Sequence, residues 1–128
     1  MPDKILLIEN DVENRDLIRA SLEQNGYEVV IATDGVSGYD TALFFKPDLI
    51  VTDIQIPGAD GLHVVRRVRD TPSLEETSIL ITTDFGNGSA TFALQLGAHG
   101  FEPKPIKPES FLSTVRRLLK DRNSKKAA

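Results

Sequence analysis

The stretch LIVTDIQIPGADGL, residues 49–62, has the pattern of a buried strand that ends on a single carboxylate. Four apolar or β-branched residues lead into Asp53, and a proline and a glycine follow shortly after it, at Pro57 and Gly58. A short apolar run bounded by turn-forming residues is typical of a strand covered on both faces. Asp53 therefore stands where a buried strand ends, either as a plain turn residue or as a functional group.

Similar short runs recur on both sides of this stretch, and longer amphipathic segments separate them. The last segment is the clearest helix, because its apolar residues recur with the helical period from Phe111 to Leu119. We expect strands at 4–9, 27–32, 47–53, 78–83 and 99–103, and helices at 13–25, 35–46, 60–70, 87–97 and around 111–119. Strands that alternate with helices predict an α/β fold, with a parallel sheet covered on both faces.

Length and composition limit the classes of protein. The 128 residues suffice for one domain, and the absence of cysteine excludes a disulfide framework. A net charge of −4 leaves no basic footprint for direct nucleic-acid binding. No signal sequence or membrane-spanning run is present, so we expect a cytoplasmic protein without a membrane partner. We predict a domain over 1–122 and a flexible tail or linker stub over 123–128, because no apolar period follows Leu119.

Polar residues gather at the predicted strand ends. Glu9, Asn10 and Asp11 follow the first strand, Thr83 and Asp84 close the fourth, and Lys104 follows the fifth. In open α/β sheets, ligands bind outside the carboxyl ends of the strands. The first and third strands of a doubly wound sheet are neighbours, so we expect Glu9, Asn10 and Asp53 to converge. Their oxygen atoms suit a hard divalent ion such as Mg²⁺.

Four short stretches of the sequence together resemble a known family, the CheY-like receiver domain of two-component response regulators. They are the acidic cluster after ILLI, the phrase TDIQIPGADGL, the hydroxyl of Thr83 and the KPI that begins at Lys104. The resemblance extends from Lys4 to about Lys120. It implies a flavodoxin-like sheet with strand order 2-1-3-4-5 and five helices.

The resemblance also implies a mechanism. Asp53 would take a phosphoryl group from a histidine kinase, from a phosphotransfer protein or from a small phosphodonor. Lys104 and the Thr83 hydroxyl would bind phosphoryl oxygens, and Thr83 with Phe101 would form the switch. The family ligands of Mg²⁺ fall on Glu9, Asn10, Asp53 and the backbone carbonyl of Gln55. Such a domain is no enzyme beyond promoting its own phosphorylation and dephosphorylation.

The chain departs from the family pattern at two positions. Asn10 stands where an aspartate usually binds the metal, and the alternative register makes Asn10 and Asp11 the metal pair. Asp84 follows Thr83 directly, where a small residue is common, and its charge opposes an incoming phosphoryl group. A pseudo-receiver that binds partners without phosphorylation is therefore one alternative function.

Other interpretations of these residues stay open. Glu9, Asn10 and Asp11 suit helix N-caps. Thr83 can be a plain strand residue, Lys104 a surface lysine and Phe101 a permanently buried ring. A small flavodoxin-like or haloacid-dehalogenase-like phosphohydrolase is a further alternative, although the latter needs a second aspartate where Gln55 stands. We expect a monomer or weak dimer, with an output partner or effector domain that the sequence does not identify.

Overall fold

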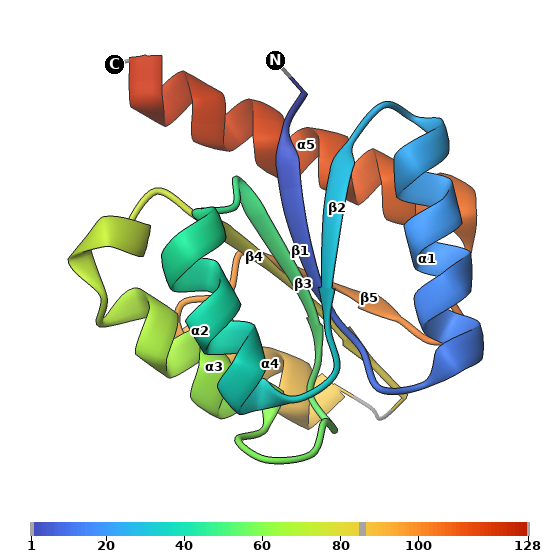
Figure 1. The fold of residues 1–128 in the computed structure, drawn as a ribbon, viewed down its shortest axis with the longest axis horizontal. Coiled ribbons are helices and arrows are strands. Elements are labelled where there is room, and N and C mark those ends of the chain that lie inside the picture. The colour runs from blue at the N-terminus through green and yellow to red at the C-terminus, as the bar shows by residue number, and fades with distance from the viewer. Residues whose placement is uncertain (1, 85–86, 128) are drawn as a thin grey trace.

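A five-stranded parallel sheet forms the centre of the molecule. The computed structural model describes residues 2–84 and 87–127. The strands lie in the order β2-β1-β3-β4-β5, which confirms the predicted order (Figure 1). Their bounds are β1 (Lys4–Ile8), β2 (Glu28–Ala32), β3 (Leu49–Asp53), β4 (Ser78–Thr83) and β5 (Gly100–Pro103).

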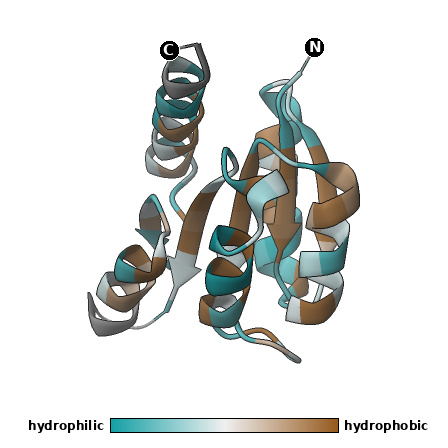
Figure 2. Ribbon diagram, turned by 90° about the vertical axis from the view of Figure 1, so that its left-hand side faces the viewer, coloured by the Kyte–Doolittle hydropathy of each residue, from teal (hydrophilic) through white to brown (hydrophobic). Residues whose placement is uncertain are grey.

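Helices cover both faces of this sheet, as the alternation of strands and helices predicted. On one face lie α2 (Gly35–Phe45), α3 (Gly61–Arg69) and α4 (Asn87–Leu96), and on the other lie α1 (Val12–Gln24) and α5 (Pro108–Ala127). Figure 2 shows mostly hydrophobic strands between helices that carry hydrophilic residues. In the part of the chain that is described, no helix is both long and apolar enough to span a membrane.

The alternation of side chains along the strands divides the core into two clusters. Leu6 and Ile8 of β1 pack with α2 and α3, whereas Ile5 and Leu7 pack with α1 and α5. All four side chains are fully buried. Because successive residues of a strand point to opposite faces, the same rule gives the direction of each polar residue at the strand ends.

The helix ends and short helices agree only in part with what the sequence predicted. Gly26 adopts a φ of 87° after the C-cap Asn25 of α1, which is the left-handed conformation that commonly ends a helix. The short 3-10 helix at Pro72–Leu74 was not predicted. The segment predicted as a flexible tail or linker stub, 123–128, continues α5 as far as Ala127. The domain boundary at residue 122 itself stays a prediction.

A buried carboxylate joins β5 to α5. Glu102 is 8% exposed, and its two oxygens accept hydrogen bonds from Ser110 Oγ at 2.9 Å and Thr114 Oγ1 at 2.8 Å. Both hydroxyls come from α5, so this carboxylate holds the helix against the edge strand. A buried carboxylate that loses a donor keeps the full cost of its desolvation.

Thr114→Val should therefore destabilise the fold by about 1–3 kcal/mol, because the near-isosteric valine leaves Glu102 Oε2 without its donor. Urea unfolding followed by circular dichroism measures the change. The control is Ser113→Ala on the exposed side of the same helix, which should stay within about 0.5 kcal/mol of wild type. Equal unfolding midpoints for the two variants would contradict the role of Glu102.

Candidate functional site

An open cleft lies at the carboxyl edge of the sheet, where the sequence placed its polar residues. It has a volume of about 610 Å³. The candidate residues that line it are Glu9, Asn10, Asp53, Gln55, Asp84 and Lys104. The start of α1 closes one side of the cleft. The predicted convergence of the first, third and fifth strand ends is therefore present in the fold.

Asp53 is the last residue of β3, and its side chain is only 8% exposed. Its Oδ2 lies 2.7 Å from Lys104 Nζ, and its Oδ1 accepts a hydrogen bond of 3.3 Å from the backbone N–H of Gln55. The carboxylate is thus fixed at the end of a buried strand beside a cation. This arrangement does not match a plain turn residue, whose side chain would face solvent.

Lys104 joins two carboxylates that lie on neighbouring strands. Its Nζ is 2.7 Å from Asp53 Oδ2 and 2.9 Å from Glu9 Oε1, and its side chain is only 4% exposed. Burial alone would lower the pKa of Lys104, but the hydrogen bonds and charges of Asp53 and Glu9 outweigh it, so the pKa is raised. Lys104 therefore stays protonated at neutral pH and is no surface lysine.

Glu9 and Asp11, two of the three N-cap candidates, make different contacts. Glu9 is buried, with Lys104 as the charge partner of Oε1 and the N–H of Asp11 as the donor to Oε2 at 3.2 Å. Asp11 is the N-cap of α1 and accepts a 2.9 Å hydrogen bond from the N–H of Asn14. Asn10 lies between them and is exposed at the cleft. The capping interpretation therefore holds for Asp11 and fails for Glu9.

Thr83 and Phe101 share one face of the sheet. Thr83 lies two residues after Ile81, which belongs to the core cluster beneath α2, α3 and α4. Phe101 packs against that same cluster. Ile81 pairs with Phe101 across the two strands, so Thr83 and Phe101 are diagonal neighbours. Thr83 is buried, and its carbonyl accepts the backbone N–H of Lys104 at 2.8 Å. The two predicted switch residues are therefore adjacent.

Two further features of the site bear on the predictions. The Lys104–Pro105 peptide bond is cis. Asp84 is exposed and lines the cleft, so its charge does face the approach to Asp53. Sequence reasoning missed the ion pair between Lys104 and Glu9, because no local signal connects residues so far apart in the chain.

The oxygen donors for a metal ion are few. Among residues 2–84 and 87–127, no three acidic, histidine or cysteine side chains come close enough to hold a metal by themselves. Of the carboxylates that line the cleft, the two buried ones are Glu9 and Asp53, and Asn10 and Gln55 lie beside them. A metal here would depend on amide and carbonyl oxygens as well as on charge.

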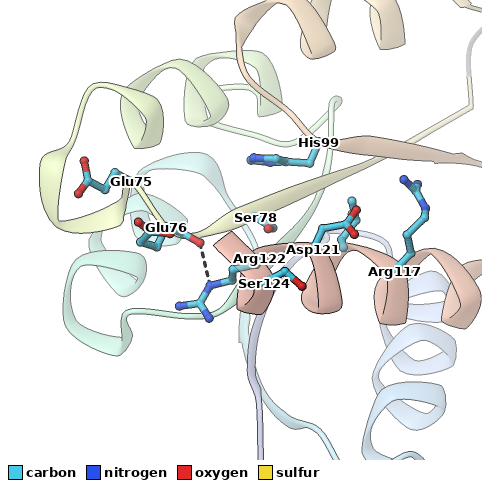
Figure 3. Close-up of a pocket in the computed structure, with 9 residues that line it drawn as sticks. Glu75, Glu76, Ser78, His99, Arg117, Asp121, Arg122 and Ser124 are labelled. Carbon is cyan, nitrogen blue, oxygen red and sulfur yellow. Dashed lines mark hydrogen bonds between the residues drawn. The ribbon is translucent and has the colours of Figure 1, made fainter. Parts of the chain in front are cut away.

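A second pocket lies at the opposite edge of the sheet and lacks the candidate site residues (Figure 3). It has a volume of about 340 Å³ between the residues before β4, His99 and the C-terminal half of α5. Arg122 of α5 donates a 2.7 Å hydrogen bond to the Glu76 carbonyl and pairs with Asp48 at 3.1 Å. These contacts fasten α5 to the body of the domain at Arg122, directly before the segment that was predicted to be a tail.

Comparison with known proteins agrees with this geometry. A model of the response regulator receiver domain matches residues 5–116. The chain belongs to this family. As a receiver domain it is a component of two-component signal transduction, and such domains are typically not true enzymes. The flavodoxin-like, CheY-like fold and the resemblance drawn from the sequence are both confirmed.

Individual relatives show how far the likeness extends. The response regulator MprA of Mycobacterium sp. (strain KMS) is 38% identical over 121 residues, which cover 94% of this chain and 52% of MprA. The receiver domain thus spans about half the length of the curated relatives it matches. The chemotaxis response regulator CheY4 of Vibrio cholerae superposes with a TM-score of 0.86 at 28% identity, covering 92% of this chain and 99% of CheY4.

One solved relative carries a metal ion. The receiver domain of a sensor histidine kinase from Pseudomonas aeruginosa PAO1 has magnesium coordinated in its active-site cleft. It superposes with a TM-score of 0.86 at 27% identity, covering 93% of this chain and 98% of the relative. The magnesium ion was observed in that relative.

Proposed function

We propose that this receiver domain is a phosphoacceptor whose Asp53 takes a phosphoryl group from the phosphohistidine of a histidine kinase or phosphotransfer protein. The observation that carries the proposal is the contact of Asp53 Oδ2 with Lys104 Nζ at 2.7 Å, in an open cleft at the end of a buried strand. This contact supports the proposal, because a carboxylate and a cation lie together in a cleft that a phosphoryl group could enter.

The transfer needs positioning and charge neutralisation more than covalent help from the protein. A carboxylate oxygen of Asp53 forms a bond to phosphorus as the bond from phosphorus to the donor nitrogen breaks, and the freed imidazole takes up a proton. Lys104 then moves from Asp53 to a phosphoryl oxygen while Glu9 continues to balance its charge. The Thr83 hydroxyl donates to a second phosphoryl oxygen.

The cleft fits Mg²⁺ by the chemistry of its donors. Glu9, Asn10, Asp53 and the carbonyl of Gln55 are hard oxygen ligands, and the cleft is open enough for the waters that Mg²⁺ retains. The ion would supply positive charge that helps to neutralise the incoming phosphoryl group. The protein residues do the rest: Asp53 attacks, Lys104 and Thr83 bind the phosphoryl oxygens, and the buried strand end keeps Asp53 in place.

Intact-mass measurement tests the proposal. The protein is incubated with Mg²⁺ and acetyl phosphate, a small phosphodonor, and then weighed by mass spectrometry. We expect a gain of one phosphoryl group that disappears when EDTA replaces Mg²⁺. A mass that never changes would reject the phosphoacceptor function.

An unchanged mass would favour a pseudo-receiver, the second candidate function. Two observations support it: Asn10 lacks the charge of a metal-binding aspartate, and exposed Asp84 faces the cleft. A phosphohydrolase has less support, because Gln55 offers no carboxylate beside Asp53. Under either leading candidate we propose a cytoplasmic module, monomeric or weakly dimeric, that contacts an output partner or effector domain.

We expect phosphorylation to act through Thr83 and Phe101. Movement of Thr83 towards the phosphoryl group frees space on the face it shares with Phe101, and α4 packs over that face. Beryllium fluoride, which mimics the phosphoryl group, should therefore shift the backbone amide resonances of 87–96 more than those of α1. Shifts confined to the loops around Asp53 would contradict this coupling.

A further inference from the structure

The start of α2 lies beside the loop that follows Asp53, residues 54–60 (Figure 1). The two backbones are in direct contact there. The Gly35 N–H donates a 3.0 Å hydrogen bond to the Pro57 carbonyl. A Cβ built on Gly35 would lie 1.7 Å from the carbonyl oxygen of Ala59, a distance that no side chain tolerates. Only glycine permits this contact between segments that are distant in sequence.

The start of α2 is rigid enough to act as a support. Asp34 caps the helix through Ser37, with its Oδ1 at 2.8 Å from the Ser37 N–H and its Oδ2 at 2.9 Å from the hydroxyl. Gly38 fits so closely over Ile8 of β1 that a Cβ there would lie 2.6 Å from the Ile8 side chain. The helix is therefore fixed to the sheet, whereas Gln55, Pro57 and Gly58 of the loop are exposed.

The other end of the loop is fastened at the site itself. The N–H of Gln55 donates to Asp53 Oδ1 at 3.3 Å, and the N–H of Gly61 donates to the Ile54 carbonyl at 2.8 Å. The loop thus extends from the nucleophile to α2 and back to the start of α3. A backbone carbonyl such as that of Gln55 has no rotamer to adjust, so the packing of its segment sets its position.

We propose that Gly35 is a positioning residue: it lets the start of α2 hold the loop 54–60, and with it Gln55, in register with Asp53. The magnesium part of this inference rests on the proposed function, whereas the loop contact does not. A side chain at position 35 forces the two backbones apart. Ile54 and Ile56 of the loop are buried in the core, so the loop yields at its exposed residues before the core-packed helix does. The result is a displaced Gln55 and a weaker hydrogen bond to Asp53.

Gly35→Ala tests the proposal, with Gly26→Ala as the matched control. Gly26 has a φ of 87° and nothing within 4 Å of its would-be Cβ, so alanine strains the backbone there without touching the loop. In metal-free protein, Gly35→Ala should speed hydrogen exchange of the Gln55 amide by about ten-fold, as expected for local opening, and Gly26→Ala should leave it unchanged. Unchanged Gln55 exchange in Gly35→Ala would overturn the proposal.

Mg²⁺ titration followed by amide shifts gives the second readout. Gly35→Ala should weaken Mg²⁺ binding by about ten-fold, the usual scale for groups that orient metal ligands, whereas Gly26→Ala should bind like wild type. Wild-type affinity in Gly35→Ala would overturn the positioning role. If wild type itself does not bind Mg²⁺, the proposed metal site fails, and the metal-free exchange still decides the role of Gly35.

The wild-type protein provides a reciprocal measurement should Gly35→Ala not fold. Because linkage is mutual, Mg²⁺ should slow exchange of the Gly35 amide, which is bonded to Pro57. The Gly26 amide, bonded to the Glu23 carbonyl at the far end of α1, should not respond. Equal responses of the two amides to saturating Mg²⁺ would count against the coupling of α2 to the site.

Discussion

Asp53→Asn should abolish the phosphoryl mass gain that we expect for the wild-type receiver domain. An amide oxygen is a poor nucleophile, and no described carboxylate can take over the position. Glu9 also contacts Lys104, but it is 1% exposed and directly follows β1, whereas Asp53 ends β3 beside β4. Only Asp53 is therefore next to both Lys104 and the strand that ends in Thr83.

The measurement is intact mass after incubation with acetyl phosphate and Mg²⁺, with circular dichroism to show that the variant is folded. Asp84→Asn is the matched control, because it removes a charge from the same cleft without touching the nucleophile. It should accept the phosphoryl group at least as fast as wild type. A phosphorylated Asp53→Asn protein would show that the nucleophile has been assigned to the wrong residue.

Sequence alone predicted most of the fold, because the apolar pattern of each strand is local and strong. The run from Leu49 to Val51 and its counterparts fixed five strand positions, and all five strands lie within the predicted ranges. The α/β alternation then predicted a parallel sheet, and the carboxyl ends of its strands located the cleft. Asp53 and Lys104 were found in this way before any contact was known.

The contacts that complete the site carry no such local signal. The ion pair of Lys104 with Glu9 joins opposite ends of the chain, and the packing of Gly35 on Ala59 depends on two backbones meeting. The helix after residue 122 was missed for another reason. Its polar residues have no apolar period, whereas Arg122 directly before it fastens α5 to Asp48 and to the Glu76 carbonyl.

Asn10 is the position where this chain differs most from what a magnesium site favours. The described cleft holds two buried or nearly buried carboxylates, Glu9 and Asp53, and Lys104 already neutralises part of their charge. Asp11 is engaged as the cap of α1 through the N–H of Asn14. Asn10, exposed beside Glu9 in this cleft, presents an uncharged amide where a carboxylate would add to the attraction for a divalent cation.

Asn10→Asp should therefore tighten Mg²⁺ binding and speed phosphorylation at limiting Mg²⁺. One added charge near the ion is worth about 1–2 kcal/mol at the effective dielectric of a protein surface, which corresponds to about ten-fold or more in affinity. Mg²⁺ titrations followed by amide shifts measure this. Asp11→Asn is the control, because asparagine caps a helix as well as aspartate does and the metal affinity should stay near that of wild type. Should Asn10→Asp titrate like wild type while Asp11→Asn loses affinity, Asp11 is the metal ligand; should neither variant respond to Mg²⁺, the pseudo-receiver becomes the better description.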